Sequence, residues 1–183
     1  MFKELLNIVI KTLWLDNTVY RINKKNFDPA IYFALIIIII SIIIQTIPNN
    51  IYLGWMADLG LANYKQIKFR DLLFSGLFFW LLKSIYFYVI GKFIFPNKKI
   101  KFTILNILTI TGFTHSPLLF NFLAYRKDFL FLLFITYVWY LIAQTIAINE
   151  IFDYKNKLKS FLIVSAPIWI PFIIIVFLFS LSK

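Results

Sequence analysis

Lys83 is the first residue that could carry chemistry in this chain, because it lies near the middle of an apolar stretch from residue 72 to residue 95. If that stretch crosses a bilayer, a basic side chain at such depth costs about 3 kcal/mol or more and is by default a functional candidate. The alternative is that its amine snorkels to a headgroup or meets carbonyl groups inside a helix bundle. Gly76 lies seven residues earlier on the same side, and small residues mark helix contacts. We therefore expect Lys83 to face the interior.

A second group of polar residues follows in the next apolar stretch. On a helix Thr111, Thr114, His115 and Asn121 share one stripe, and Gln144 could join them from the stretch after. One histidine cannot hold a metal by itself, and no acidic residue lies inside a hydrophobic core to complete a metal site or a proton relay. We expect this polar intramembrane seam to serve interhelical hydrogen bonding, at about 0.6 kcal/mol for each bond.

Prolines predict breaks in the helices that carry these residues. Pro117, Pro167 and Pro171 lie inside apolar stretches, and each removes one backbone donor. Broken helices mark binding sites in some transporters, although they also occur in bundles without a transport role. Gly112 should allow a neighbouring helix to approach closely, with Pro117 bending the chain about a turn later.

The carbonyl group that Pro117 leaves free is that of Phe113. We expect the Lys83 amine to donate to this carbonyl, with Thr114 or His115 as further acceptors, because no buried carboxylate is available.

The sequence predicts no catalytic residue, no cofactor site and no metal site. The chain has no cysteine, its serines lack a neighbouring base and acid, and its five glycines form no phosphate-binding loop. An enzyme is therefore not expected.

The elements that position these residues are helices in a membrane. Hydrophobic residues make up 61% of the chain and charged residues 15%, against about 25% charged in a soluble domain. No alternation with a period of two appears, which excludes a β-barrel. We predict an all-α, polytopic bundle with five spans, and four spans with one re-entrant segment as the alternative. The predicted spans form one domain from 30 to 183, at about 30–47, 72–95, 102–124, 129–148 and 160–181.

Two further segments are expected to lie at the membrane surface. Residues 1–29 form a cytoplasmic segment whose first part is amphipathic, and it predicts either an interfacial helix or a helix packed on the end of the bundle. Its apolar face would consist of Phe2, Leu5, Leu6, Val9 and Leu13. The link from Pro48 to Asp71 is too apolar for a free loop, so we expect a short interfacial helix there, with Trp55 at headgroup depth.

Charge predicts the orientation. With the N-terminus inside, the inner segments carry twelve basic residues and the outer ones six, which places the C-terminus outside. The net charge of +11 is spread over the links between apolar stretches instead of covering one soluble face, which argues against nucleic-acid binding.

The arrangement resembles the Yip family of membrane proteins, which has a cytoplasmic N-terminus and five closely spaced spans. The similar motif is Gly112-Phe113-Thr114-His115-Ser116-Pro117-Leu118-Leu119, continued by Trp139, Ala143, Ala147 and Asn149-Glu150. Residues 1–29 lack the long arm and the Asp-Leu-Tyr-Gly-Pro-type motif of the trafficking members, and Asn97-Lys98-Lys99 stand where prokaryotic relatives often have a glycine pair. These departures argue against Rab-type GTPase binding.

The favoured function is therefore that of a non-enzymatic protein of a bacterial inner membrane that organises or contacts lipids, partner membrane proteins or a second copy of itself. A small transporter or channel subunit that uses the polar seam is the alternative, and a lipid-modifying enzyme is a third hypothesis. A continuous polar cavity that reaches Lys83 would favour transport, whereas a seam sealed by aromatic side chains would favour a scaffold.

Overall fold

The computed structural model describes residues 2–21, 27–60, 68–97 and 102–181, and the side chains of 27–29, 127 and 171–181 lie outside this description. Within these ranges the chain contains helices and no strand, which confirms the all-α class. The α-helices are α1 (Phe2–Leu13), α2 (Phe27–Asp58), α3 (Phe69–Val89), α4 (Ile104–Phe113), α5 (Phe131–Phe152) and α6 (Lys157–Leu181). A π-helical turn (Ile90–Ile94) continues α3, and 3-10 turns cover Asn17–Tyr20, Ser116–Leu123 and Lys127–Phe129.

In the part of the chain that the structure describes, three helices are long and apolar enough to cross a membrane. They cover Ala30–Asp58, Phe69–Ile94 and Phe131–Phe152, in the regions of the first, second and fourth predicted spans. Five crossings remain a prediction.

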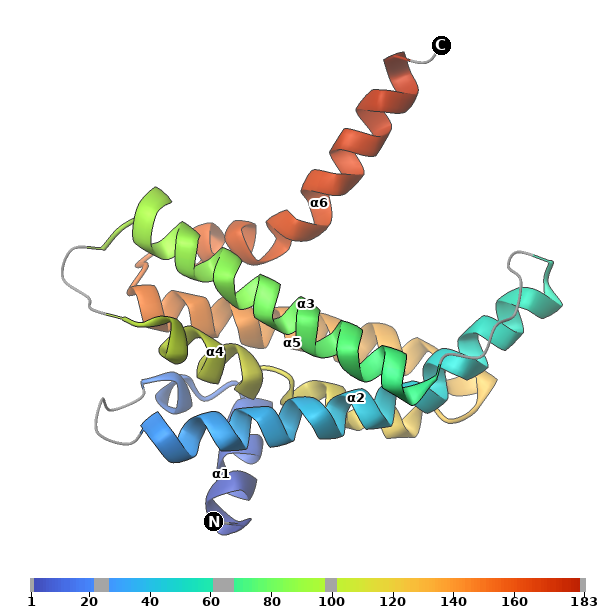
Figure 1. The fold of residues 1–183 in the computed structure, drawn as a ribbon, viewed down its shortest axis with the longest axis horizontal. Coiled ribbons are helices and arrows are strands. Elements are labelled where there is room, and N and C mark those ends of the chain that lie inside the picture. The colour runs from blue at the N-terminus through green and yellow to red at the C-terminus, as the bar shows by residue number, and fades with distance from the viewer. Residues whose placement is uncertain (1, 22–26, 61–67, 98–101, 182–183) are drawn as a thin grey trace.

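The three long helices surround the broken segment of α4 and the 3-10 turn that follows it (Figure 1). α2 packs on α4, on the 3-10 segment Ser116–Leu123 and on α3, while α5 packs on that 3-10 segment and on α6. The end of α2 and the starts of α3 and α5 lie at the same end of the bundle, which is the end opposite to α1 (Figure 1). The arrangement leaves α3 and α5 on two sides of a space whose floor is the 3-10 segment.

The predicted third span, 102–124, is not one helix. α4 ends at Phe113, and the chain resumes as a 3-10 helix at Ser116 with Pro117 in its first turn. Three side chains favour this break by competing for backbone carbonyls: Thr114 Oγ1 donates to Thr111, His115 Nδ1 also reaches Thr111, and Ser116 Oγ donates to Phe113. The polar seam therefore lies at a broken helix in the middle of the bundle.

The helix that contains the first predicted span is longer than that span, because α2 continues through Pro48 to Asp58. The short helix expected after Pro48 is therefore the end of α2 and not a separate element. Polar side chains support the backbone around the proline, since Thr46 Oγ1 donates to the carbonyl of Ile42 and Asn50 Nδ2 donates to the carbonyl of Thr46.

The N-terminal segment is attached to the end of α5. Glu150, of which 18% of the side chain is exposed, accepts from Asn17 Nδ2 at 2.8 Å and pairs with Arg21 Nε at 2.9 Å. Asp16 caps the 3-10 turn with its carboxylate, which accepts a hydrogen bond from the backbone N–H of Thr18. This bond lowers the pKa of the Asp16 carboxyl group. In α1, Leu5 and Val9 pack against the main core, whereas Phe2 and Leu6 remain exposed. Placement of α1 in a membrane interface remains a prediction.

At the same end, the link between α5 and α6 packs on the end of α3. Tyr154 donates its hydroxyl to the carbonyl of Phe95 at 2.9 Å, and burial raises the pKa of this tyrosine to about 12. Asp153 ends α5 in the left-handed conformation.

The first half of α6 packs on the bundle. Ile163, Val164 and Ser165 are buried, and Tyr86 donates to the carbonyl of Ile163. The second half turns away from the other helices (Figure 1). Pro167 is exposed at this point, and the helix continues through it, while the side chain of Pro171 lies outside the described residues.

Candidate functional site

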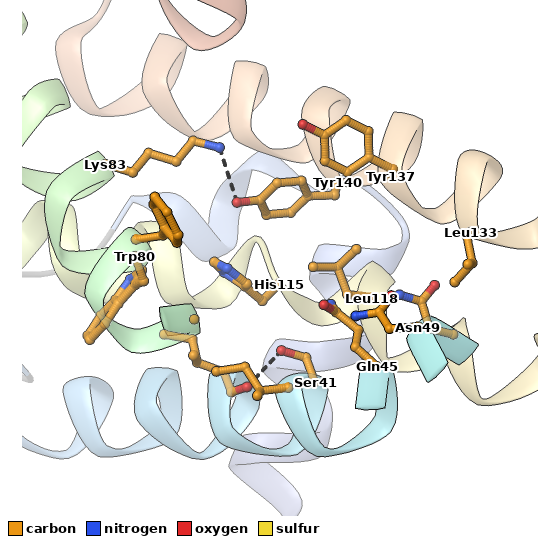
Figure 2. Close-up of a pocket in the computed structure, with 15 residues that line it drawn as sticks. Ser41, Gln45, Asn49, Trp80, Lys83, His115, Leu118, Leu133, Tyr137 and Tyr140 are labelled. Carbon is orange, nitrogen blue, oxygen red and sulfur yellow. Dashed lines mark hydrogen bonds between the residues drawn. The ribbon is translucent and has the colours of Figure 1, made fainter. Parts of the chain in front are cut away.

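A partly open cavity of about 430 Å³ lies between α2, α3, α5 and the 3-10 segment (Figure 2). Its walls are the middle parts of α2 and α3, the first half of α5, and the 3-10 segment with the preceding His115. The lining combines apolar and polar side chains: Ile38, Ser41, Ile42, Gln45, Asn49, Gly76, Phe79, Trp80, Lys83, His115, Leu118, Asn121, Leu133, Tyr137 and Tyr140. Three residues of the predicted seam, Lys83, His115 and Asn121, are therefore brought together on one cavity.

Lys83 reaches across the cavity from α3 to α5. Its Nζ donates to the hydroxyl of Tyr140 at 3.1 Å and lies 4.7 Å from the centre of the Tyr140 ring (Figure 2). The prediction that this amine donates to the carbonyl of Phe113, with Thr114 or His115 as further acceptors, is wrong, because its described hydrogen bond goes to Tyr140. The Phe113 carbonyl accepts from Ser116 Oγ at 2.8 Å instead. A phenol hydroxyl and the face of its ring attract a cation without neutralising it.

Gln144 stands behind Tyr140, one helical turn further along α5. Its Nε2 donates to the same hydroxyl at 2.8 Å, so Tyr140 accepts from both Lys83 and Gln144. Gln144 is buried and does not line the cavity. Its contribution is to hold the phenol against Lys83.

His115 contacts the cavity with a ring whose tautomer follows from its partner. Nδ1 lies 2.9 Å from the carbonyl oxygen of Thr111, and a carbonyl oxygen only accepts. Nδ1 therefore carries the proton, and in the neutral ring Nε2 is the free acceptor. The ring also packs edge-on against Tyr140, with the ring centres 4.9 Å apart.

Thr111 and Thr114 lie behind the cavity and hold the broken helix together. The hydroxyl of Thr111 accepts from Trp80 Nε1 at 3.0 Å and lies 2.8 Å from the hydroxyl of Ser84. Both threonines are buried. The contacts of Thr111 join α4 to α3 as interhelical hydrogen bonds, which is the role expected for the seam.

Asn121, at the far end of the 3-10 segment, accepts from the hydroxyl of Thr136 on α5. This bond fixes the floor of the cavity to α5.

Sequence reasoning missed the polar side of α2. Ser41, Gln45 and Asn49 line the cavity opposite Lys83 and Tyr140 (Figure 2). The signal was their spacing of four residues, which places them on one face of an otherwise isoleucine-rich helix. It also missed Tyr137 and Tyr140, since tyrosines do not stand out in a chain that is 20% aromatic.

A second cavity adjoins the first near the end of α2 and the start of α5. The two share Asn49, Leu133 and Tyr137, and the second also has Tyr52, Trp55 and Asp128 in its walls. The two cavities are therefore neighbours, and the three shared side chains lie between them.

The arrangement fits binding better than bond-making chemistry. Among the described residues, no group of three or more His, Asp and Glu side chains could hold a metal ion. The cavity offers one amine, one imidazole acceptor, amides and phenols, which are groups that recognise a polar ligand by charge and hydrogen bonds.

We found no family model, no curated protein and no solved structure that matches this chain.

Proposed function

We propose that this chain is a non-enzymatic integral membrane protein whose half-open cavity binds a ligand through polar groups. The observation that carries the proposal is the partly open cavity of about 430 Å³ that Lys83 lines together with Gln45 and Asn49 of α2. A scaffold would seal its polar seam with aromatic side chains, whereas here the seam opens onto space. The cavity therefore favours the transport hypothesis over the scaffold hypothesis.

The proposed topology has five crossings. α2, α3 and α5 are three of them, the broken segment 104–123 is the fourth and α6 is the fifth. The basic bias of twelve to six supports a cytoplasmic N-terminus and an external C-terminus in a bacterial inner membrane. In this orientation the cavity opens toward the outer side. The proposal also includes membership of the Yip family, which is supported by the similar motif at residues 112–119.

Accessibility of the cavity to a thiol reagent tests the proposal, because the chain has no cysteine and each introduced one is unique. Gln45→Cys and Asn49→Cys line the cavity and should react with a membrane-impermeant maleimide that is added from the outer side. Thr109→Cys is the matched control, since Thr109 is fully buried in the same bundle away from the cavity.

Labelling of the cavity cysteines in intact cells, with Thr109→Cys unlabelled until the protein is denatured, would support a ligand cavity. Protection of all three until denaturation would mean that the seam is sealed, and the scaffold hypothesis would replace the proposal. Reaction from the inner side alone would reverse the orientation.

A further inference from the structure

Among the residues that the structure describes, the positive charge of Lys83 has no negative partner in the cavity. The described lining contains no acidic side chain, and the groups around Nζ are the Tyr140 hydroxyl and the ring faces of Tyr140 and Phe87. In a low-dielectric surrounding, an ammonium that is only hydrogen-bonded to a neutral hydroxyl gains strongly from an anion. The missing complement of this cavity is a negative charge.

The α2 side of the cavity offers donors for the same group. Gln45 and Asn49 are half-buried, and among the described contacts their side-chain amides make no hydrogen bond. An unpaired amide in apolar surroundings is costly, and a ligand with several oxygen acceptors would satisfy it. Carboxylate and phosphate groups have such oxygens.

Part of the cavity wall, on α3 and on α5, also belongs to the outer surface of the bundle. Phe79 on α3 is 65% exposed and Tyr137 on α5 is 43% exposed, and both line the cavity. Two residues that belong both to the cavity wall and to the outer surface mark an opening through which an apolar chain can leave the site. Around this opening the outer face carries the large apolar side chains Phe78, Leu82, Phe134 and Val138.

The path from the rim does not repel an anion. Asp128 is the one acidic residue in the wall of the second cavity, and Arg126 lies 3.7 Å from its carboxylate. The charge at the rim is therefore paired, and Lys83 at the inner end is not.

We propose that the cavity binds the anionic headgroup, carboxylate or phosphate, of a membrane amphiphile, with Lys83 as the anion-binding residue and the acyl part leaving between Phe79 and Tyr137. This inference rests on the proposed ligand cavity and names the class of its ligand. Anion binding would also explain why the Lys83 amine on α3 lies in a cavity whose described lining has no carboxylate.

The test uses the full chain reconstituted in vesicles and then transferred to mild detergent. Native mass spectrometry counts the phosphatidylglycerol that stays bound, and phosphatidylcholine with the same acyl chains is the zwitterionic comparison. The native chain should retain phosphatidylglycerol about tenfold better than phosphatidylcholine, the size expected for a hydrogen bond to a charged group.

Lys83→Met should abolish this preference, and Lys83→Arg, which keeps the charge, should retain it. Lys92→Met is the matched control, because Lys92 lies on the same helical segment and also donates to a tyrosine hydroxyl, that of Tyr88, yet is exposed outside the cavity. It should leave the preference unchanged. Size-exclusion profiles identify any variant that fails to fold. If Lys83→Met fails to fold, the lipid preference of Lys83→Arg is compared with those of the native chain and of Lys92→Met.

Inorganic phosphate separates the two sources of an anionic group. If phosphate removes the bound phosphatidylglycerol only at high concentration, the acyl chain contributes and the inference stands. Phosphate binding at Lys83 without any preference for phosphatidylglycerol would overturn the lipid ligand. Equal retention of both lipids by the native chain, together with labelled cavity cysteines, would overturn this inference and leave the proposed cavity intact.

Discussion

Tyr140 is the residue on which the polar groups of the cavity converge. Its hydroxyl accepts from Lys83 and from Gln144, and its ring lies against His115. Gln144 is buried, and its Oε1 already has no partner among the described residues. One phenol oxygen therefore accepts hydrogen bonds from two donors that lie on different sides of it.

Tyr140→Phe should therefore destabilise the protein by about 1–3 kcal/mol, because it leaves the buried Gln144 amide without a partner. Thermal unfolding in detergent measures the change. Tyr137→Phe is the control, since Tyr137 is partly exposed and its hydroxyl makes no hydrogen bond among the described contacts. Equal melting temperatures for both variants would contradict a structural role for the Tyr140 hydroxyl.

Residue types alone indicate part of this site. Lys83 and His115 are conspicuous because a charged and a titratable side chain are rare in apolar stretches. The acceptor of Lys83 was not predictable, because Ser116 competes for the Phe113 carbonyl and tyrosines are too frequent in this chain to be singled out. Gln45 and Asn49 could have been found from their spacing alone.

At the scale of the helices, contact between α2 and α4 depends on Gly112. A methyl group added there would lie 2.5 Å from Cβ of Ala34, an atom fixed to the backbone of α2. At Gly76 the nearest atom is Cδ1 of Ile42 at 2.7 Å, which is the flexible end of a side chain.

Gly112→Ala should therefore lower the free energy of unfolding by about 1–3 kcal/mol. Gly76→Ala should lower it clearly less, because the side chain of Ile42 can rotate away and Cβ of Ala34 cannot. Chemical denaturation of both variants in the same detergent measures the difference. A reversed order would mean that α2 shifts as a whole at little cost.

Glu150 holds the N-terminal segment to α5 through Asn17 and Arg21. Glu150→Ala should increase hydrogen exchange in residues 2–21, by less than about tenfold, because Arg21 is 65% exposed and its ion pair is screened. Glu150→Gln is the matched control, since it keeps an acceptor for Asn17 and should lie between the native chain and Glu150→Ala. Unchanged exchange in Glu150→Ala would show that the packing of Leu5 and Val9 alone fixes the segment.

Helix boundaries are predictable only where the sequence has no competing signal. The amphipathic pattern of residues 2–13 indicates α1, and the apolar stretch before Asn149 indicates α5. Pro48 suggests an end, yet the flanking side chains of Thr46 and Asn50 bond to carbonyls and α2 continues. Around Thr114–Ser116 the sequence predicts a bent helix, and there the same kind of bond breaks the helix.

For the whole molecule, the charge bias predicts that a reporter fused after Lys183 lies outside and one fused before Phe2 lies inside. An alkaline phosphatase fusion at the C-terminus should be active, and a green fluorescent protein fusion there should be dark. The opposite pair of results would mean that either the number of crossings or the orientation is wrong.

The long helices differ in length, and the difference affects where the mouth of the cavity lies relative to the bilayer surface. α2 has 32 residues and α5 has 22, so they extend over about 48 Å and about 33 Å. A hydrocarbon layer of about 30 Å matches α5, and the last turns of α2, with Tyr52 and Trp55, then stand beyond it. In a thicker bilayer acyl chains would rise along this wall and cover the mouth of the cavity. Access to Lys83 would then depend on the thickness of the bilayer, so that lipids of different chain length would tune occupancy without touching the site.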